Sequence, residues 1–460
     1  MAEALEKQYS ARKVLSRQDE LVELARSGLA ASAADQTQVR IIASDGALTR
    51  FANSEIHQNT FEREALVAVT ARIGQSEGSA NTNRLTKEAL VGAVEQATAA
   101  ARVSAPNPDL ADFPDGPRDY PFQVDYYEGS AACTPEERAK RVISGFNVND
   151  DKSYTAAGTL STGQVNVVTA NSRGIEAAYN TTLAKYTVMW SGPSSSGYQE
   201  QTSRNIADIN TEKASVEALA TARRSADPRG DIPEGRYTVI LEAECVATML
   251  NFLCWMGLSG KDYLDQASFM CGKLGEPVTG ADFTLADEPL DPQTMGVPCD
   301  ASGMPKQRLM LIEGGVARAV AHDANTARRA GTASTGHDTG FNFPMPTNLV
   351  LSGGAATREE LIAGVKRGIL VSRFHYTNVV DPLATVITGM TRDGTFLIED
   401  GEIVSGLTNF RFTQNILQAF ANCTGMSTKQ VFHSAFWGSG SLVPEAVRVD
   451  GFNFSGKTGF

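Results

Sequence analysis

The sequence lacks several features by which a protein usually shows its chemistry or its compartment. Its six cysteines are scattered with no C-x-x-C spacing, which indicates reduced thiols and not a disulfide framework. No apolar run approaches the roughly eighteen residues needed to cross a bilayer, and the charged N-terminus has no apolar core of the signal-peptide type. We therefore expect a cytoplasmic protein that does not act at a membrane.

Histidine is scarce and dispersed. The chain has five histidines, and none pairs with another at i+3 or i+4, the spacing that places two zinc ligands on one helix face. Three of them could still converge in the fold, but singly hydrogen-bonded or surface histidines are the commoner arrangement. The sequence also has no nucleophile elbow, because Gly438-Ser439-Gly440-Ser441 has only the character of a flexible turn, and it has no Walker-type or dinucleotide glycine pattern.

Positive charge is in deficit. Lysine and arginine number 41 against 53 aspartates and glutamates, which gives a net charge of −12. A nucleic-acid partner calls for a basic face, so this balance argues against nucleic acid while leaving peptides open as ligands.

The length of 460 residues and a hydrophobic content of 42% fit a globular protein of two domains, or of three small ones. A cluster of breakers, DPRGDIPEG at 227–235, marks the expected boundary. We predict an α+β protein, with an N-terminal α/β domain at 1–230 that contains antiparallel strands and a C-terminal strand-rich domain at 231–460, either barrel-like or a sandwich.

In the N-terminal part, alternating strands and capped helices are expected. Gln38–Ser44 is a predicted strand, followed by a hairpin turn at Asp45-Gly46, and a second turn is predicted at Ser161–Gly163. Thr134 followed by Pro135 predicts the start of a helix. Five prolines at 105–121 predict a long, semi-rigid connector.

The stretch from Arg236 to Met256 predicts an apolar strand that runs into an almost wholly apolar helix. Enzymes often seat metal ligands at such a junction. The helix, however, contains no histidine, aspartate or serine, and its cysteines, Cys245 and Cys254, are surrounded by apolar neighbours. These residues predict a core helix. It begins near Glu242, and its one further acid is Glu244.

Late in the chain, the segment from Met390 to Phe396 predicts a hairpin with Arg392-Asp393 at its tip. The tip has two readings, ordinary turn chemistry or a loop that meets a peptide or a partner.

Seven short segments stand out along the chain: Arg50–Gln58, Asn171–Gly174, Gly272–Val278, Gly303–Pro305, Leu311–Val316, Pro346–Leu349 and Phe396–Ile403. Taken together in order and spacing, they resemble the TldD/TldE (PmbA) family, long known as "modulator of gyrase" proteins and understood as metallopeptidase components. The resemblance covers nearly the whole chain. The acidic balance gives no support to a link with gyrase itself.

In that family the TldD subunit carries H-E-x-x-x-H on the helix after the strand, and a late cysteine completes the zinc site. The histidine positions fall near Asn251 and Met256, the glutamate near Phe252 and the cysteine near Phe436. An amide, a thioether and two phenyl rings cannot hold Zn²⁺ or supply a general base. The resemblance thus implies a TldE-type subunit with no catalytic residue, metal ligand or cofactor of its own, paired with a TldD-type subunit that holds zinc.

The function implied is to complete a closed chamber that degrades short unfolded peptides. The residues expected to meet a peptide or an interface are Arg373, His375, Asn378, Arg392 and Asp393. Two alternatives stay open: a stand-alone binding or regulatory protein of the same fold, and an independent peptidase with a relocated metal site.

Overall fold

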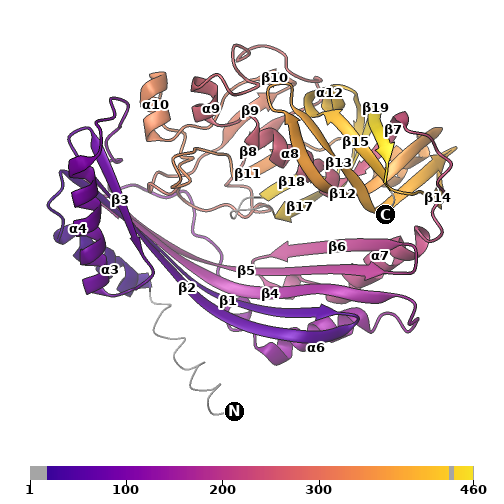
Figure 1. Ribbon diagram of the computed structural model, residues 1–460, viewed down its shortest axis with the longest axis horizontal. Helices are drawn as coiled ribbons and strands as arrows, with labels where there is room; N and C mark the ends of the chain where they lie inside the picture. The colour runs from indigo at the N-terminus through magenta and orange to yellow at the C-terminus, as the bar shows by residue number, and fades with distance from the viewer. Residues whose placement is uncertain (1–17, 435–439, 459–460) are drawn as a thin grey trace.

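The computed structural model describes residues 18–434 and 440–458 (Figure 1). One broad, curved sheet built from the N-terminal part of the chain lies below a strand-rich C-terminal part (Figure 1). The mixed α+β character and the antiparallel sheets agree with the predicted fold class. The boundary at 230/231 stays a prediction.

The N-terminal sheet is antiparallel throughout, in the order β3-β2-β1-β4-β5-β6. Its strands are β1 (Gln36–Ala52), β2 (Glu55–Ile73), β3 (Ser76–Thr82), β4 (Thr155–Asn171), β5 (Glu176–Ser191) and β6 (Ser196–Ser203). Buried and half-buried residues alternate along β1, as expected for a strand whose two faces have different surroundings.

Helices pack against both ends of this sheet (Figure 1). They are α3 (Gln18–Ala30), α4 (Lys87–Val103), α5 (Glu128–Ala131), α6 (Pro135–Phe146), η1 (Ile206–Asp208) and α7 (Thr211–Arg224). The start predicted for α6 is confirmed, because the side chain of Thr134 accepts a hydrogen bond from the Glu137 amide and Pro135 occupies the first turn. Between α4 and α5, the connector at 105–121 contains no helix or strand.

The C-terminal part contains a closed ring of strands in the order β12-β7-β19-β15-β13, with β13 pairing back onto β12. This is a small barrel, to which β14 and β16 add at β13 and β19. The strands are β7 (Gly235–Glu242), β12 (Arg367–Asp381), β13 (Val386–Glu399), β14 (Glu402–Gly406), β15 (Phe410–Asn415), β16 (Cys423–Met426) and β19 (Ala446–Lys457).

A second C-terminal sheet runs in the order β10-β9-β8-β11-β18-β17. Its strands are β8 (Leu285–Asp287), β9 (Leu309–Glu313), β10 (Val316–Ala317), β11 (Asn348–Leu351), β17 (Gln430–Ser434) and β18 (Gly440–Pro444). The helices of this part are α8 (Ala243–Trp255), α9 (Gly260–Leu264), α10 (Ala324–Ala330), α11 (Arg358–Ala363) and α12 (Ile416–Ala421). One hydrophobic cluster joins the barrel, this sheet and α8. No helix in the described ranges is long and apolar enough to cross a membrane.

The turns predicted at Asp45-Gly46 and at Ser161–Gly163 are wrong. Asp45 and Gly46 lie inside β1, Gly46 faces Gly163 of β4, and the chain instead turns at Asn53-Ser54, where both residues have positive φ (51° and 60°). A Cβ on Gly163 would lie 2.4 Å from the Asp45 carbonyl oxygen. The glycine therefore permits close approach of two strands, a role that local sequence cannot distinguish from a turn.

The hairpin tip predicted at Arg392-Asp393 is also wrong. Arg392 lies within β13 opposite Arg373 of β12, and the link between these two strands falls instead at residues 382–385. The register shifts beside Arg373, and Asp393 and Gly394 have φ of 54° and 128°. Asp393 and Gly394 therefore lie in a β-bulge, which places the charged side chain of Asp393 in the barrel wall.

We expect Gly197→Ala to destabilise the protein, because β6 and α7 approach too closely for a side chain there. An added Cβ would lie 2.0 Å from the Ala218 carbonyl oxygen and 2.7 Å from the Ala222 nitrogen. Such overpacking costs about 1–3 kcal/mol, measurable as a lower urea midpoint.

The matched control is Gly92→Ala in α4, where the new Cβ would meet nothing within 4 Å. It should raise stability by about 0.5–1 kcal/mol. Equal midpoints for the two variants would contradict the close packing of β6 on α7.

Candidate functional site

Helix α8 (Ala243–Trp255) lies between the barrel and the second C-terminal sheet, in contact with β12 and β18. Its cysteines are core residues: the Cys245 thiol donates to the Val371 carbonyl (3.4 Å) and the Cys254 thiol to the Pro346 carbonyl (3.7 Å). Burial raises the pKa of both thiols, so neither is a ready nucleophile or soft-metal ligand.

The first turn of α8 carries one acid, Glu244, and it does not face the apolar core. Its Oε2 lies 2.9 Å from Nδ1 of His433 on β17, and its Oε1 lies 3.9 Å from Nε of Arg373 on β12. Burial alone would raise the pKa of Glu244, but the hydrogen bond and charge of His433, with Arg373 and Lys185, lower it. Glu244 is therefore ionised at neutral pH, close to the cations Arg373 and Lys185.

Arg373 is paired a second time, with Asp393 in the bulge of β13. Its Nη1 lies 2.7 Å from Asp393 Oδ2, and its guanidinium sits 3.9 Å from the centre of the Tyr198 ring on β6. Asp393 is 2% exposed, and its other oxygen accepts a hydrogen bond from the Ser196 hydroxyl (2.6 Å). These contacts join the C-terminal barrel to the last strand of the N-terminal sheet.

A third ion pair lies beside the other two. Lys185 Nζ is 2.9 Å from Glu200 Oε1 and donates to the Ser434 hydroxyl (2.7 Å), which itself donates to Glu200 (2.9 Å). The Tyr198 hydroxyl donates to the other oxygen of Glu200 (3.0 Å). We name the whole set the polar junction. Its members are Lys185, Ser196, Tyr198, Glu200, Glu244, Arg373, Arg392, Asp393, His433 and Ser434.

Of the five residues predicted to meet a peptide or an interface, the structure brings three together. Arg373, Arg392 and Asp393 belong to the polar junction. His375 lies further along β12 against the ring of Tyr376, and Asn378 is exposed near the end of the strand. Contact of any of the five with a peptide stays a prediction.

Sequence reasoning missed most of the junction. Lys185, Tyr198 and Glu200 lie in strands with no motif of their own. One signal was available, since a lone acid on an apolar helix requires a hydrogen-bonding or cationic partner when it is buried. That signal pointed to Glu244, but it could not name His433, which is 189 positions away by their residue numbers.

The residues at the zinc positions implied by the resemblance do not fit a zinc ion. Asn251 and Phe252 are half-buried, the Phe252 ring packs edge-on against Trp255 at 5.7 Å, and Met256 is buried in the core. Phe436 lies outside the described residues. Across 18–434 and 440–458, no group of three or more His, Cys, Asp or Glu side chains could hold a metal ion. That the whole chain binds no zinc stays a prediction.

Comparison with known sequences gives two family matches. The PmbA/TldA metallopeptidase C-terminal domain matches residues 234–456, and the PmbA/TldA metallopeptidase domain 1 matches residues 38–101. A metalloprotease PmbA homolog of Haemophilus influenzae is 22% identical over 92% of this chain and 94% of its own length.

Two further relatives align over shorter stretches. An uncharacterized protein of Methanocaldococcus jannaschii is 28% identical over 39% of this chain, and a metalloprotease TldD homolog of Haemophilus influenzae is 30% identical over 37%. These alignments span only 44% and 36% of the relatives' own lengths.

Two solved structures share the fold. TldE from Thermococcus kodakarensis superposes with a TM-score of 0.85 at 20% identity, covering 95% of this chain and all of that one. A putative modulator of a DNA gyrase from Thermotoga maritima gives 0.82 at 19% identity, covering 91% and 95%. With both domain matches in chain order on a shared fold, this chain belongs to the PmbA/TldD family of metallopeptidase-like proteins.

Proposed function

We propose that this chain is a TldE-like, non-catalytic subunit of a two-component zinc metallopeptidase. Its partner is a TldD-type subunit that holds the zinc, and the pair cleaves short unfolded peptides in the cytoplasm. The observation that carries the proposal is the last part of α8, with Asn251 and Phe252, and the C-cap Met256 that follows it. Where the family resemblance places two ligands and a base, this helix offers an amide, a phenyl ring and a buried thioether.

The polar junction supports a structural role for the chain. Its three ion pairs, Lys185–Glu200, Glu244–Arg373 and Arg373–Asp393, lie where the N-terminal sheet meets the C-terminal part. Charges neutralised in this way fix the orientation of two surfaces more than they drive chemistry. A fixed orientation is what a subunit needs in order to form one wall of a chamber.

A strand at the edge of its sheet supports a role in holding extended peptides. Within 18–434 and 440–458, β17 ends its sheet and pairs with β18 alone, and it carries His433 and Ser434 of the polar junction. A peptide added to such an edge is bound through main-chain groups, which tolerates many sequences. Among the predicted contact residues, Arg392 keeps 43% of its side chain exposed and is better placed to meet a peptide than the enclosed Asp393.

Mixing the chain with a TldD-type partner tests the proposal. We expect cleavage of a short unstructured peptide by the mixture, no cleavage by this chain alone, and about one zinc per partner subunit. The measurements are peptide cleavage by chromatography, metal analysis of each purified chain, and size-exclusion chromatography of the mixture. A matched control is the same partner with its zinc-binding histidines changed to alanine, which should complex with this chain but leave the peptide intact.

Each contrary result points to one alternative. Absence of a stable complex would favour a stand-alone binding protein of the same fold. Stoichiometric zinc on this chain alone, together with cleavage by it, would favour an independent peptidase with a relocated metal site.

Replacing Glu244 with glutamine tests the polar junction itself. Because the folded protein lowers the pKa of Glu244, its ionised form stabilises the fold above its usual pKa of about 4.3, and that contribution is lost as the pH falls through the lowered value. We expect Glu244→Gln to cost about 1–3 kcal/mol at neutral pH, by urea unfolding, with the difference from wild type shrinking in acid.

The matched control for this variant is Glu217→Gln on α7. Glu217 is 46% exposed and pairs only loosely with Lys213, at 3.9 Å. Exposed helix pairs contribute about 0.3–0.5 kcal/mol, so this change should be small at every pH. A Glu244→Gln cost that does not vary with pH would show that the carboxylate charge is not what matters there.

A further inference from the structure

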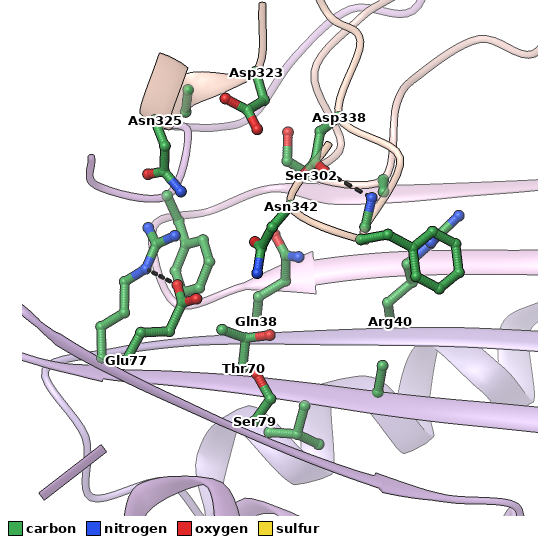
Figure 2. A pocket seen from close by; sticks show the side chains of 18 of the residues that line it. Gln38, Arg40, Thr70, Glu77, Ser79, Ser302, Asp323, Asn325, Asp338 and Asn342 are labelled. Carbon is green, nitrogen blue, oxygen red and sulfur yellow. Dashed lines mark hydrogen bonds and ion pairs between the residues drawn. The ribbon is translucent and has the colours of Figure 1, made fainter. Parts of the chain in front are cut away.

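A cavity of about 230 Å³ lies away from the polar junction, between the N-terminal sheet and the loops of the C-terminal part (Figure 2). Strands β1, β2 and β3 form one side. The connector at 112–114, the start of α10 with its N-cap (323–325), and the loops at 301–302 and 338–342 form the other. The cavity is thus assembled from segments far apart in sequence, all within this one chain.

The β1 side presents two polar side chains that the protein does not satisfy. Gln38 and Arg40 lie two positions apart on β1, so they point to the same face (Figure 2). The Oε1 of Gln38 and the Nε of Arg40 are buried and have no hydrogen-bond partner. Arg40 makes one long hydrogen bond, from Nη1 to the Thr339 carbonyl (3.4 Å), and no described carboxylate lies within ion-pair distance of it. Buried polar atoms usually have a hydrogen-bond partner, and a bound ligand could supply the partner that these two atoms lack.

The opposite side presents a carboxyl group, that of Asp338. One of its oxygens accepts a hydrogen bond from the Gly340 amide (2.7 Å), while its own amide donates to Asp300 (3.0 Å). Burial, and then the charge of Asp300, raise the pKa of Asp338 to about 7. A second acid, Asp323, is already used to cap α10 through the Thr326 amide (2.7 Å). Asp338 is therefore the acid available to a ligand.

Neutral and paired groups complete the lining. Asn342, in a left-handed turn with φ of 56°, reaches toward Gln38 (Figure 2). Arg72 is paired with Glu77 at 2.8 Å and stacks on Phe113 at 3.7 Å, so its charge is already neutralised. Asp112 also lines the cavity, but it accepts a hydrogen bond from Gln36 (2.6 Å) and lies 3.7 Å from Arg173. Among the described lining residues, the charges left for recognition are therefore those of Arg40 and Asp338.

We propose that this cavity is a binding site for a small zwitterion, a free α-amino acid or a dipeptide, with the ligand carboxylate on Arg40 and its ammonium on Asp338. Amides of Gln38 and Asn342 would meet the atoms between the two charges. A simple anion would face Asp338 and a simple cation would face Arg40, so a ligand that bears both charges fits best. The volume lies below the roughly 300 Å³ at which pockets for drug-sized ligands begin, which matches a small ligand.

This inference does not depend on the proposed subunit role. Every group involved belongs to this chain, and binding is measured on the chain alone. Failure to assemble with a TldD-type partner would leave the cavity proposal intact, and failure to bind the zwitterion would leave the subunit proposal intact.

Calorimetric titration of the purified chain with L-alanyl-L-alanine tests the proposal directly. We expect saturable binding that weakens at least about tenfold when the ligand amine is acetylated, and again when its carboxylate is made an amide, because each change removes one charge-assisted contact. This ligand series uses the unaltered protein, so it does not depend on any variant folding.

Variants assign the contacts. Arg40→Gln and Asp338→Asn should each weaken binding at least about tenfold. Arg50→Gln is the matched control, since Arg50 lies on the same strand, ten residues further on, is exposed, and does not line the cavity. It should bind the dipeptide as the wild type does.

The pH dependence supplies a readout that a purely structural role would not produce. Asp338 faces Asp300, Asp323 and Arg40, and it loses its proton near pH 7. Between about pH 6 and pH 7.5 the dipeptide ammonium stays mostly protonated, so affinity should rise with pH in the wild type and stay flat in Asp338→Asn.

Three results would overturn the proposal: no binding at about 10 mM dipeptide, equal binding of the doubly blocked ligand, or unchanged affinity in a folded Arg40→Gln variant.

Discussion

The ion pair between Arg373 and Asp393 is the contact on which the arrangement of the two parts depends. Asp393 is almost fully buried, and a buried carboxylate is tolerated only when it is paired and hydrogen-bonded. Its partners come from both sides: Arg373 from the barrel and Ser196 from the N-terminal sheet. The bulge in β13, with φ of 54° at Asp393, is what turns this side chain out of the barrel and toward β6. A local irregularity in one strand thereby fixes the relation between two sheets.

The place of α8 in the fold depends on its apolar residues. The helix keeps its place between barrel and sheet because its apolar residues, among them Leu250 and Leu253, are fully buried there. Those contacts do not require a metal ligand at Asn251 or Met256. The apolar contacts that hold α8 in place are therefore separate from the positions at which the family resemblance expects metal ligands. Function in this family has to be argued from the site and not from the fold.

Sequence reasoning succeeded where the signal was local and failed where it was not. The helix start at Thr134 and the strand that leads into α8 depend on neighbouring residues, and both are present. The glycine at 163 and the acid at 393 were taken for turn residues, because their roles depend on strands distant in the chain. The same holds for the polar junction, in which Lys185 meets Ser434. Composition and motif spacing do not predict contacts between residues so far apart in the sequence.

Two polar regions lie between the N-terminal sheet and the C-terminal part, and they differ in how their charges are used. In the polar junction each full charge faces an opposite one, as Lys185 does Glu200 and Arg373 does Asp393. In the cavity, Arg40 and Asp338 influence each other but do not come within ion-pair distance. In a contact that only stabilises the fold, we expect the two opposite charges to form an ion pair, because an unpaired buried charge is costly. A gap kept open, with opposite charges on its two sides, is the arrangement expected where a ligand completes the pairing.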